Sequence, residues 1–142
     1  ALAAKGGAIC ASTIYLSDIK LGGKRGELFA AYERIAEMTA AEQAELARQT
    51  RALDAVSPLW DADFERYMEA LLHVIEVAGV DHVCFGADWD GGGGIRGMED
   101  ITDLPRITAR LLDKGYSRED IAKLTSGNIL RILRAAEAAA AP

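Results

Sequence analysis

Two aspartates follow a short apolar run, and four consecutive glycines come after them. Residues 84–93 read CFGADWDGGG, so Asp88 and Asp90 stand just beyond Val83-Cys84-Phe85. In barrels of parallel strands, side chains at the carboxyl ends of the strands carry the chemistry, and a carboxylate there can act as a general acid or base. A glycine-rich turn after a strand can instead hold a phosphate group. These two hypotheses predict different neighbours.

The neighbours of the glycine run argue against phosphate binding. Residues 92–97 match the pattern G-x-G-x-x-G. That fingerprint needs its glycines to open a helix inside a strand-helix-strand unit, whereas here the next helix is expected only at about Asp103, with no strand after it. Glu99 and Asp100 add negative charge around the loop, which would repel phosphate. The sequence therefore favours the barrel hypothesis.

Strand periodicity makes Asp88 the stronger catalytic candidate of the two aspartates. Side chains alternate along a strand, so an inward Asp88 would place Gly86 and Cys84 inward as well. The apolar side chains in between would then face the outer helices: Val83, Phe85 and Ala87. The alternative is an aspartate that only caps the loop, and Asp90 fits that role better.

The predicted elements form part of a βα pattern. The segments AICASTIYL (8–16) and HVCFGA (82–87) do not alternate polar with apolar residues, which indicates parallel strands buried on both sides. Helices are expected at about 27–53, 63–78, 104–114 and 128–138, and a capping box at Ser117 is expected to open a further helix that Gly127 interrupts. The first of these is broken by a capping box at Thr39, and Gly79 is expected to end the second as a left-handed cap. Residues 21–56 are expected to form a helical insertion at the surface. Two parallel strands alone leave both sheet edges unpaired, so the pattern indicates a piece of a larger sheet.

Composition excludes several classes of function. The chain has 142 residues and a net charge of −6, which argues against a nucleic-acid surface. No stretch has the roughly 18 apolar residues of a membrane span, and a soluble protein of the cytoplasm or periplasm is expected. Cys10 and Cys84 lie in apolar runs and are expected to be reduced, buried side chains. His73, with Glu69 one helical turn before it, and His82 are expected to be structural, and no Cys/His spacing indicates a metal site.

Several motifs beyond residue 76 resemble one known family. They are VAGVDHV at 77–83, the G-x-D-x-D-G pattern at 86–91, G-x-E-D at 97–100, GYSRED at 115–120 and GNILRIL at 127–133. Together they resemble the C-terminal end of the membrane (renal-type) dipeptidases, peptidase family M19 of the amidohydrolase superfamily. The resemblance covers residues 1–16 and about 64–138 and leaves the insertion unmatched.

The resemblance implies an α/β fold, namely strands seven and eight, with their helices, of a (β/α)8 TIM barrel. It implies a hydrolase that cleaves dipeptides with two zinc ions, whose ligands lie outside this chain, so that the chain is expected to be inactive by itself. Asp88 matches the family's proton-shuttling aspartate, which hydrogen-bonds the metal-bridging hydroxide and passes a proton to the leaving amine. Tyr15, Asp90 and Gly91 are carried over as candidate substrate-binding residues.

Expected partners are a dipeptide, the missing N-terminal part of the barrel and a second copy in a homodimer. Ser12-Thr13 stands where the family usually has an Asn-aromatic pair, so the substrate specificity is expected to differ. Two alternatives stay open: a non-catalytic barrel fragment or interaction module that binds through the insertion, and an amidohydrolase that acts on a modified peptide.

Overall fold

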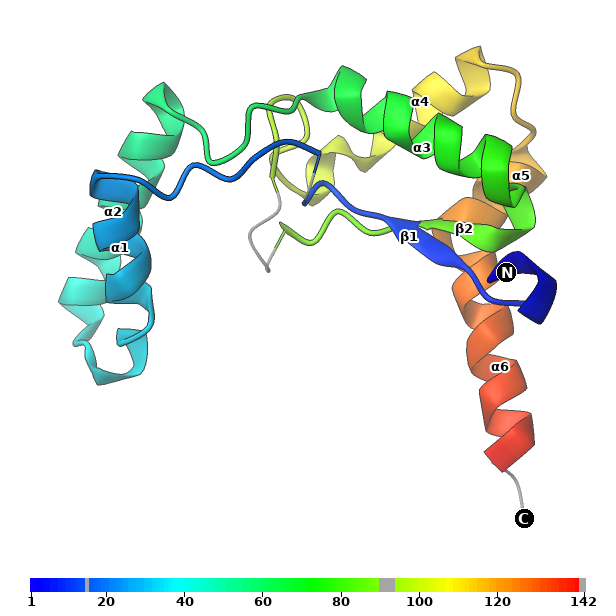
Figure 1. The fold of residues 1–142 in the computed structure, drawn as a ribbon, viewed down its shortest axis with the longest axis horizontal. Coiled ribbons are helices and arrows are strands. Elements are labelled where there is room, and N and C mark those ends of the chain that lie inside the picture. The colour runs from blue at the N-terminus through cyan, green and yellow to red at the C-terminus, as the bar shows by residue number, and fades with distance from the viewer. Residues whose placement is uncertain (15, 90–93, 141–142) are drawn as a thin grey trace. The chain divides into compact units, whose positions relative to one another are not determined.

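The chain divides into two compact units in the computed structural model, which describes residues 1–14, 16–89 and 94–140 (Figure 1). The first unit consists of Ala1–Leu16 together with Ala62–Pro142, and the second of Ser17–Asp61. None of the helices in the described ranges is both long and apolar enough to cross a membrane.

The first unit is built on a parallel pair of short strands. β1 (Ile9–Ala11) pairs with β2 (Val83–Phe85), with Cys10 directly opposite Cys84. The predicted parallel pairing is confirmed, but each strand is much shorter than the apolar segment that contains it. The prediction that both strands are buried on two sides is wrong for β1, in which Ile9 is 44% exposed. The difference follows from helix packing, because β2 contacts the helix Phe64–Ala78 and the helical segments after residue 122, whereas β1 contacts mainly the first of these.

The two cysteines form a disulfide across the strand pair. Cys10 and Cys84 are linked although 74 residues separate them in the sequence, so the expectation of reduced side chains is wrong. The expected burial holds for Cys84 but not for Cys10, which is exposed. The physical reason for the disulfide is the register, because parallel pairing places the two residues opposite each other. A register of this kind depends on long-range pairing, which the local sequence does not reveal.

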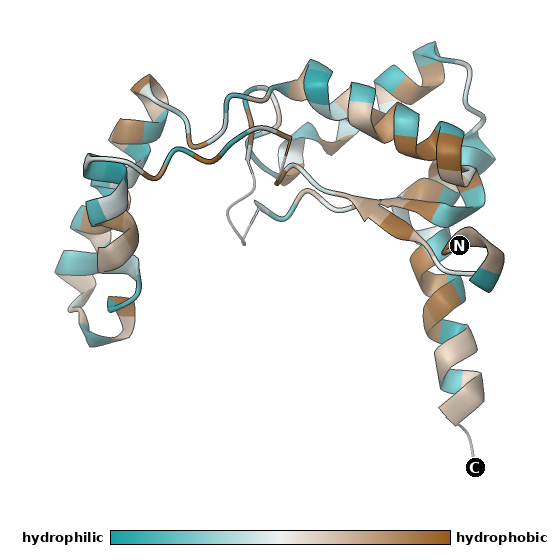
Figure 2. Cartoon of the chain, viewed as in Figure 1, coloured by the Kyte–Doolittle hydropathy of each residue, from teal (hydrophilic) through white to brown (hydrophobic). Residues whose placement is uncertain are grey.

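Helix α3 (Phe64–Ala78) carries the main hydrophobic face of the first unit. Asp63 caps it by accepting a hydrogen bond from the backbone N–H of Arg66. Hydrophobic residues recur along α3 between hydrophilic ones (Figure 2), and the buried ones are Phe64, Tyr67, Met68, Leu71 and Ile75. The predicted helix is confirmed. Its end differs from the prediction, because Gly79 has φ 85° and ψ 149° and is therefore not a left-handed cap.

The remaining helices of the first unit follow the glycine loop. They are α4 (Leu104–Asp113), α5 (Arg118–Ala122), a π-helical turn η6 (Lys123–Gly127) and α6 (Asn128–Ala140). Ser117 forms the predicted capping box with Asp120. The described residues of the unit also include the short 3-10 helices η1 (Ala3–Lys5), η3 (Val80–His82) and η5 (Ile101–Asp103).

Two polar side chains tie helices to the strands inside this core. The phenol of Tyr67, from α3, donates a hydrogen bond to the carbonyl oxygen of Ala11, and burial raises the pKa of Tyr67 well above its usual value. The amide of Asn128, which is 3% exposed, donates to the carbonyl oxygens of Val80 and Val83. Buried polar groups are stable only when paired, so these contacts fix how each helix lies on the sheet.

The second unit is a helical hairpin. Its helices are α1 (Lys24–Tyr32) and α2 (Ala40–Val56), with a 3-10 turn η2 (Ile35–Glu37) between them. Thr39 forms the predicted capping box with Glu42 at the start of α2. Leu28 and Leu46 are buried between the helices, and the buried guanidinium of Arg25 pairs with Asp54 at 2.7 Å. That residues 21–56 are an insertion into a larger barrel stays a prediction.

Candidate functional site

Asp88 lies three residues beyond the end of β2, and its side chain is exposed. Its φ is 59°, which makes it the only non-glycine residue with positive φ among those the structure describes. The left-handed region is uncommon for residues with a Cβ, although aspartate tolerates it better than most. Residues in the left-handed region often lie at functional sites, where the surrounding structure enforces the conformation.

The residues on both sides of Asp88 are held by partners from other parts of the chain. The carbonyl oxygen of Ala87 accepts a hydrogen bond from the hydroxyl of Thr13, which is fully buried. The indole N–H of Trp89 donates to the carbonyl oxygen of Met98 at 3.1 Å. The exposed carboxylate is thus carried by a short segment that is anchored at each end.

Phe85 and Ala87 both face a small cavity beside α4. They line an apolar cavity of about 190 Å³ together with Met98 and Leu104 from the following loop and from α4. The expectation that these two strand residues face the helices is confirmed. The apolar cavity therefore lies toward α4, while the Asp88 carboxylate is exposed.

The acidic residues beyond the glycine run hold the loop together. The carboxylate of Glu99 accepts a hydrogen bond from the backbone N–H of Gly97 at 2.7 Å, and Asp103 accepts one from the N–H of Glu99 at 2.9 Å. Asp100 caps η5 by accepting hydrogen bonds from the hydroxyl and the backbone N–H of Thr102, which lower the pKa of Asp100. These three carboxylates serve loop geometry and are not gathered around a common ligand site.

Three of the candidate residues cannot be placed. Tyr15, Asp90 and Gly91, the expected substrate-binding residues, lie outside the described residues. Sequence reasoning missed Thr13 as a residue of the site. Its position in the sequence was a signal, because Thr13 follows the first strand as Asp88 follows the second. The hydrogen bonds of its hydroxyl could not be predicted, because they depend on how the two strands pair.

The histidines and cysteines do not form a metal site. His73 is exposed and lies 3.9 Å from Glu76, while Glu69, expected as its neighbour, pairs with Arg66. Nδ1 of His82 lies 2.8 Å from the carbonyl oxygen of Gly7. Over residues 1–14, 16–89 and 94–140, no three His, Cys, Asp or Glu side chains are grouped to hold a metal ion. The donors present in these ranges therefore do not fit a two-zinc centre.

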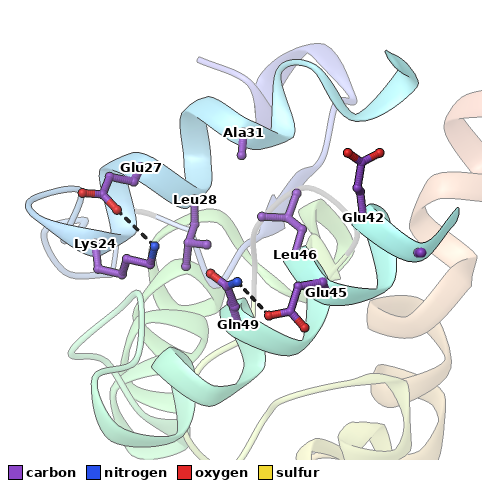
Figure 3. A pocket seen from close by; sticks show the side chains of 9 residues that line it. Lys24, Glu27, Leu28, Ala31, Glu42, Glu45, Leu46 and Gln49 are labelled. Atoms are coloured by element: carbon purple, nitrogen blue, oxygen red, sulfur yellow. Dashed lines mark hydrogen bonds and ion pairs between the residues drawn. The ribbon is translucent and has the colours of Figure 1, made fainter. Parts of the chain in front are cut away.

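A second cavity lies within the helical hairpin (Figure 3). It has a volume of about 430 Å³ and lies between α1 and α2, with Leu28 and Leu46 among its lining residues. Its carboxylates already have partners: Glu27 pairs with Lys24 at 3.1 Å, and Glu45 accepts a hydrogen bond from Gln49. Hydrogen bonds from Arg48 and Gln49 lower the pKa of Glu45 to about 2. The polar groups are thus committed to the helices that carry them, and the cavity contains no evident catalytic pair.

The described site thus consists of an exposed carboxylate just beyond one strand of a parallel pair, with helices packed on that strand. The structure is similar to the crystal structure of the probable dipeptidase PvdM from Pseudomonas aeruginosa, with a TM-score of 0.58 and 26% identity. The similarity covers 91% of this chain and 37% of that chain. The chain belongs to the membrane dipeptidase family, peptidase family M19, whose sequence pattern matches residues 12–142.

Characterised relatives share the dipeptidase description. Dipeptidase tcpJ of Claviceps purpurea is 36% identical over 81 residues, which are 56% of this chain and 19% of that protein. Dipeptidase aclJ of Aspergillus oryzae is 38% identical over 81 residues, covering 56% of this chain and 18% of that protein. The chain thus spans about a fifth of the length of the relatives it matches.

Proposed function

We propose that this chain is part of a zinc-dependent dipeptidase-like hydrolase that cleaves the peptide bond of dipeptides, with Asp88 as its proton shuttle. The observation that carries the proposal is the placement of Asp88: an exposed carboxylate just beyond a parallel strand, in a chain of the membrane dipeptidase family. The dipeptidase relatives and the similarity to PvdM support the reaction class.

Peptide hydrolysis requires a proton to move from the attacking water to the leaving amine. A carboxylate at the mouth of a barrel is suited to this transfer, because it is accessible to substrate and is a weak base. In the proposal, a carboxylate oxygen of Asp88 takes the proton as the water oxygen attacks the carbonyl carbon. The same oxygen then releases the proton to the amine nitrogen as the C–N bond breaks.

We further propose that β1 and β2 are the seventh and eighth strands of a (β/α)8 barrel whose other strands lie outside this chain. Parallel pairing and the helices packed on β2 support this placement. The two zinc ions are inferred from family membership alone. Because the described donors do not form a metal site, the ligands of these ions would come from residues outside this chain.

The test is made on the complete protein purified from its source, by intact mass, metal analysis and turnover of Ala-Ala and related dipeptides. About two zinc ions per barrel and dipeptide turnover are expected. In that enzyme, Asp88→Asn should retain the metals but lower kcat by roughly 10²–10⁴-fold. The matched control is Asp113→Asn, which alters an exposed carboxylate of α4 and should leave kcat unchanged.

Two other results would replace the proposal. A metal-free protein with no turnover would favour the non-catalytic interaction module, and its partner would then be sought with the helical hairpin. Hydrolysis of a blocked or modified peptide, but of no simple dipeptide, would favour the amidohydrolase alternative. Unchanged kcat in Asp88→Asn would remove Asp88 from the mechanism.

A further inference from the structure

We infer that Thr13 is a positioning residue, whose hydroxyl sets the orientation of Asp88 and ties the residue before Asp88 to Gly94. The inference rests on the proposed function for its catalytic consequence, and on the geometry of the first unit for its structural part.

The hydroxyl of Thr13 bridges two segments that are distant in the sequence. Thr13 lies two residues beyond β1 and has no exposed surface. Its Oγ1 donates a hydrogen bond to the carbonyl oxygen of Ala87 and accepts one from the backbone N–H of Gly94 at 3.3 Å. A hydroxyl has one donor and two acceptor lone pairs, so both bonds form at once. A valine has nearly the same shape and can form neither.

The first of these bonds acts on Asp88 through the backbone. The carbonyl of Ala87 and the N–H of Asp88 belong to one rigid peptide plane. Holding the Ala87 oxygen therefore fixes the plane from which Asp88 rotates to its φ of 59°. On the other side of Asp88, the Trp89 indole is anchored to Met98. A left-handed aspartate persists only where its surroundings over-determine its conformation, and these two anchors provide that constraint.

The second bond acts on the far end of the loop. Gly94 is the first described residue after the glycine run and has φ 107°, a conformation that residues with a Cβ rarely adopt. Because Thr13 binds Ala87 before the aspartates and Gly94 after them, one buried side chain holds both ends of the intervening segment. Ala87 and Gly94 are therefore both held by a residue that lies just beyond β1.

The test compares Thr13→Val, which removes the hydroxyl, with Thr13→Ser, which retains it. In amide hydrogen exchange followed by NMR, Thr13→Val should make the Gly94 amide exchange roughly 5- to 10-fold faster, as expected for one lost buried hydrogen bond. Thr13→Ser should stay within about twofold of the wild type. The matched control is Thr50→Val in the helical hairpin, which removes a hydroxyl that donates to the Leu46 carbonyl and should leave Gly94 unchanged.

An effect on the carboxylate itself separates positioning from general stability. The side-chain ¹³C resonance of Asp88 should shift in Thr13→Val and return in Thr13→Ser. In the complete enzyme, Thr13→Val should lower kcat roughly tenfold or more with little change in KM, since it misplaces a group that acts on the transition state. Thr13→Ser should restore kcat.

Three results would overturn the inference: a Gly94 amide in Thr13→Val that exchanges as in the wild type, an unmoved Asp88 resonance, or equal losses of kcat in the Val and Ser variants. If Thr13→Val does not fold, the wild-type protein decides, because exchange of Gly94 at the rate of an unstructured amide would exclude the bond. The exchange data do not depend on turnover. Absence of dipeptide hydrolysis by the wild-type enzyme would therefore count against the proposed function and not against the two hydrogen bonds of the Thr13 hydroxyl.

Discussion

The side-chain amide of Asn128 donates a hydrogen bond to the carbonyl oxygen of Val83 at 2.7 Å, and so joins the first residue of α6 to the first residue of β2. The same amide donates to the carbonyl oxygen of Val80 at 2.8 Å. Both amide protons are thus used on the segment that enters the strand leading to Asp88. The position of α6 and the position of the candidate catalytic strand are therefore coupled through one side chain.

Replacing Asn128 should destabilise the first unit. Asn128→Ala leaves two carbonyl oxygens without their donor and should lower the free energy of unfolding by about 2–3 kcal/mol. Asn128→Asp should cost more at pH 7, because a carboxylate would face two carbonyl oxygens, and part of this loss should be recovered at low pH. Urea denaturation measures both effects. The control is Gln43→Ala in α2, which removes an exposed amide that also donates to two carbonyl oxygens and should cost less than Asn128→Ala. An Asn128→Asp variant as stable as the wild type would contradict this account.

The disulfide should contribute strongly to stability. Cys10 and Cys84 are separated by 74 residues, and cross-linking a loop of this length restricts the unfolded chain by about 4 kcal/mol in the chain-entropy model. The double variant Cys10→Ser/Cys84→Ser, or the wild type in reductant, should lose about this much free energy of unfolding. The urea midpoint of the double variant should not respond to reductant. Equal urea midpoints for the oxidised and reduced wild type would show that the bond adds no stability.

Substitutions at Asp88 should separate the cost of its backbone conformation from its chemical role. Its φ of 59° suits glycine best, so Asp88→Gly should be about as stable as the wild type. Asp88→Ala should be about 1 kcal/mol less stable than Asp88→Gly, because alanine is strained there without the local hydrogen bonding available to aspartate. Thermal unfolding measures this difference. If the two variants have equal stability, Asp88 does not occupy the left-handed region in solution.

The ion pair between Glu65 and Arg110 should contribute to stability at neutral pH and lose that contribution in acid. Arg110 of α4 forms two hydrogen bonds of 2.6 Å with the carboxylate of Glu65 in α3, and these lower the pKa of Glu65. A carboxyl group whose pKa is lowered on folding adds stability above its unfolded pKa, and that contribution is lost as the pH falls through the folded pKa. The link between α3 and α4 should therefore weaken below about pH 4.5.

An NMR titration of the Glu65 side chain tests this pair directly. Arg110→Lys should raise the pKa of Glu65 toward its usual value, because an ammonium cannot form the paired hydrogen bonds of a guanidinium. The pair is exposed, so its contribution to stability is expected to be small. A Glu65 pKa that is the same in Arg110→Lys and in the wild type would mean that the bidentate contact does not persist in solution.

Local sequence signals predicted most of the helical framework. The apolar stripe of α3 and the capping boxes opened by Thr39 and Ser117 are all present, because each depends on residues within one or two helical turns. The parallel pairing of the two strands was also predicted, and so was the side of β2 on which Phe85 lies. The position of Asp88 at a strand end followed from the same local pattern.

The features of the strand pair that the sequence did not reveal depend on long-range register. Cys10 and Cys84 became partners only when β1 and β2 were aligned, and the same alignment brings Thr13 to the carbonyl of Ala87. The length of each strand also depends on pairing, since a strand extends only over the residues that lie beside its partner, here three in each strand. The error at His73 has a local cause. Helical spacing allows this residue to contact either Glu69 or Glu76, and the structure has the contact with Glu76.

The disulfide also determines how the chain is connected. Cys10 and Cys84 stand on either side of the whole helical hairpin, Ser17–Asp61, which therefore lies inside a covalent ring. A single cut anywhere in the hairpin opens the ring without producing two separate molecules. After such a cut, β1 and β2 remain joined, and the fragments separate on a gel only when a reductant is present. The sheet that carries Thr13 and Asp88 thus keeps its two halves linked even where the main chain between them is broken.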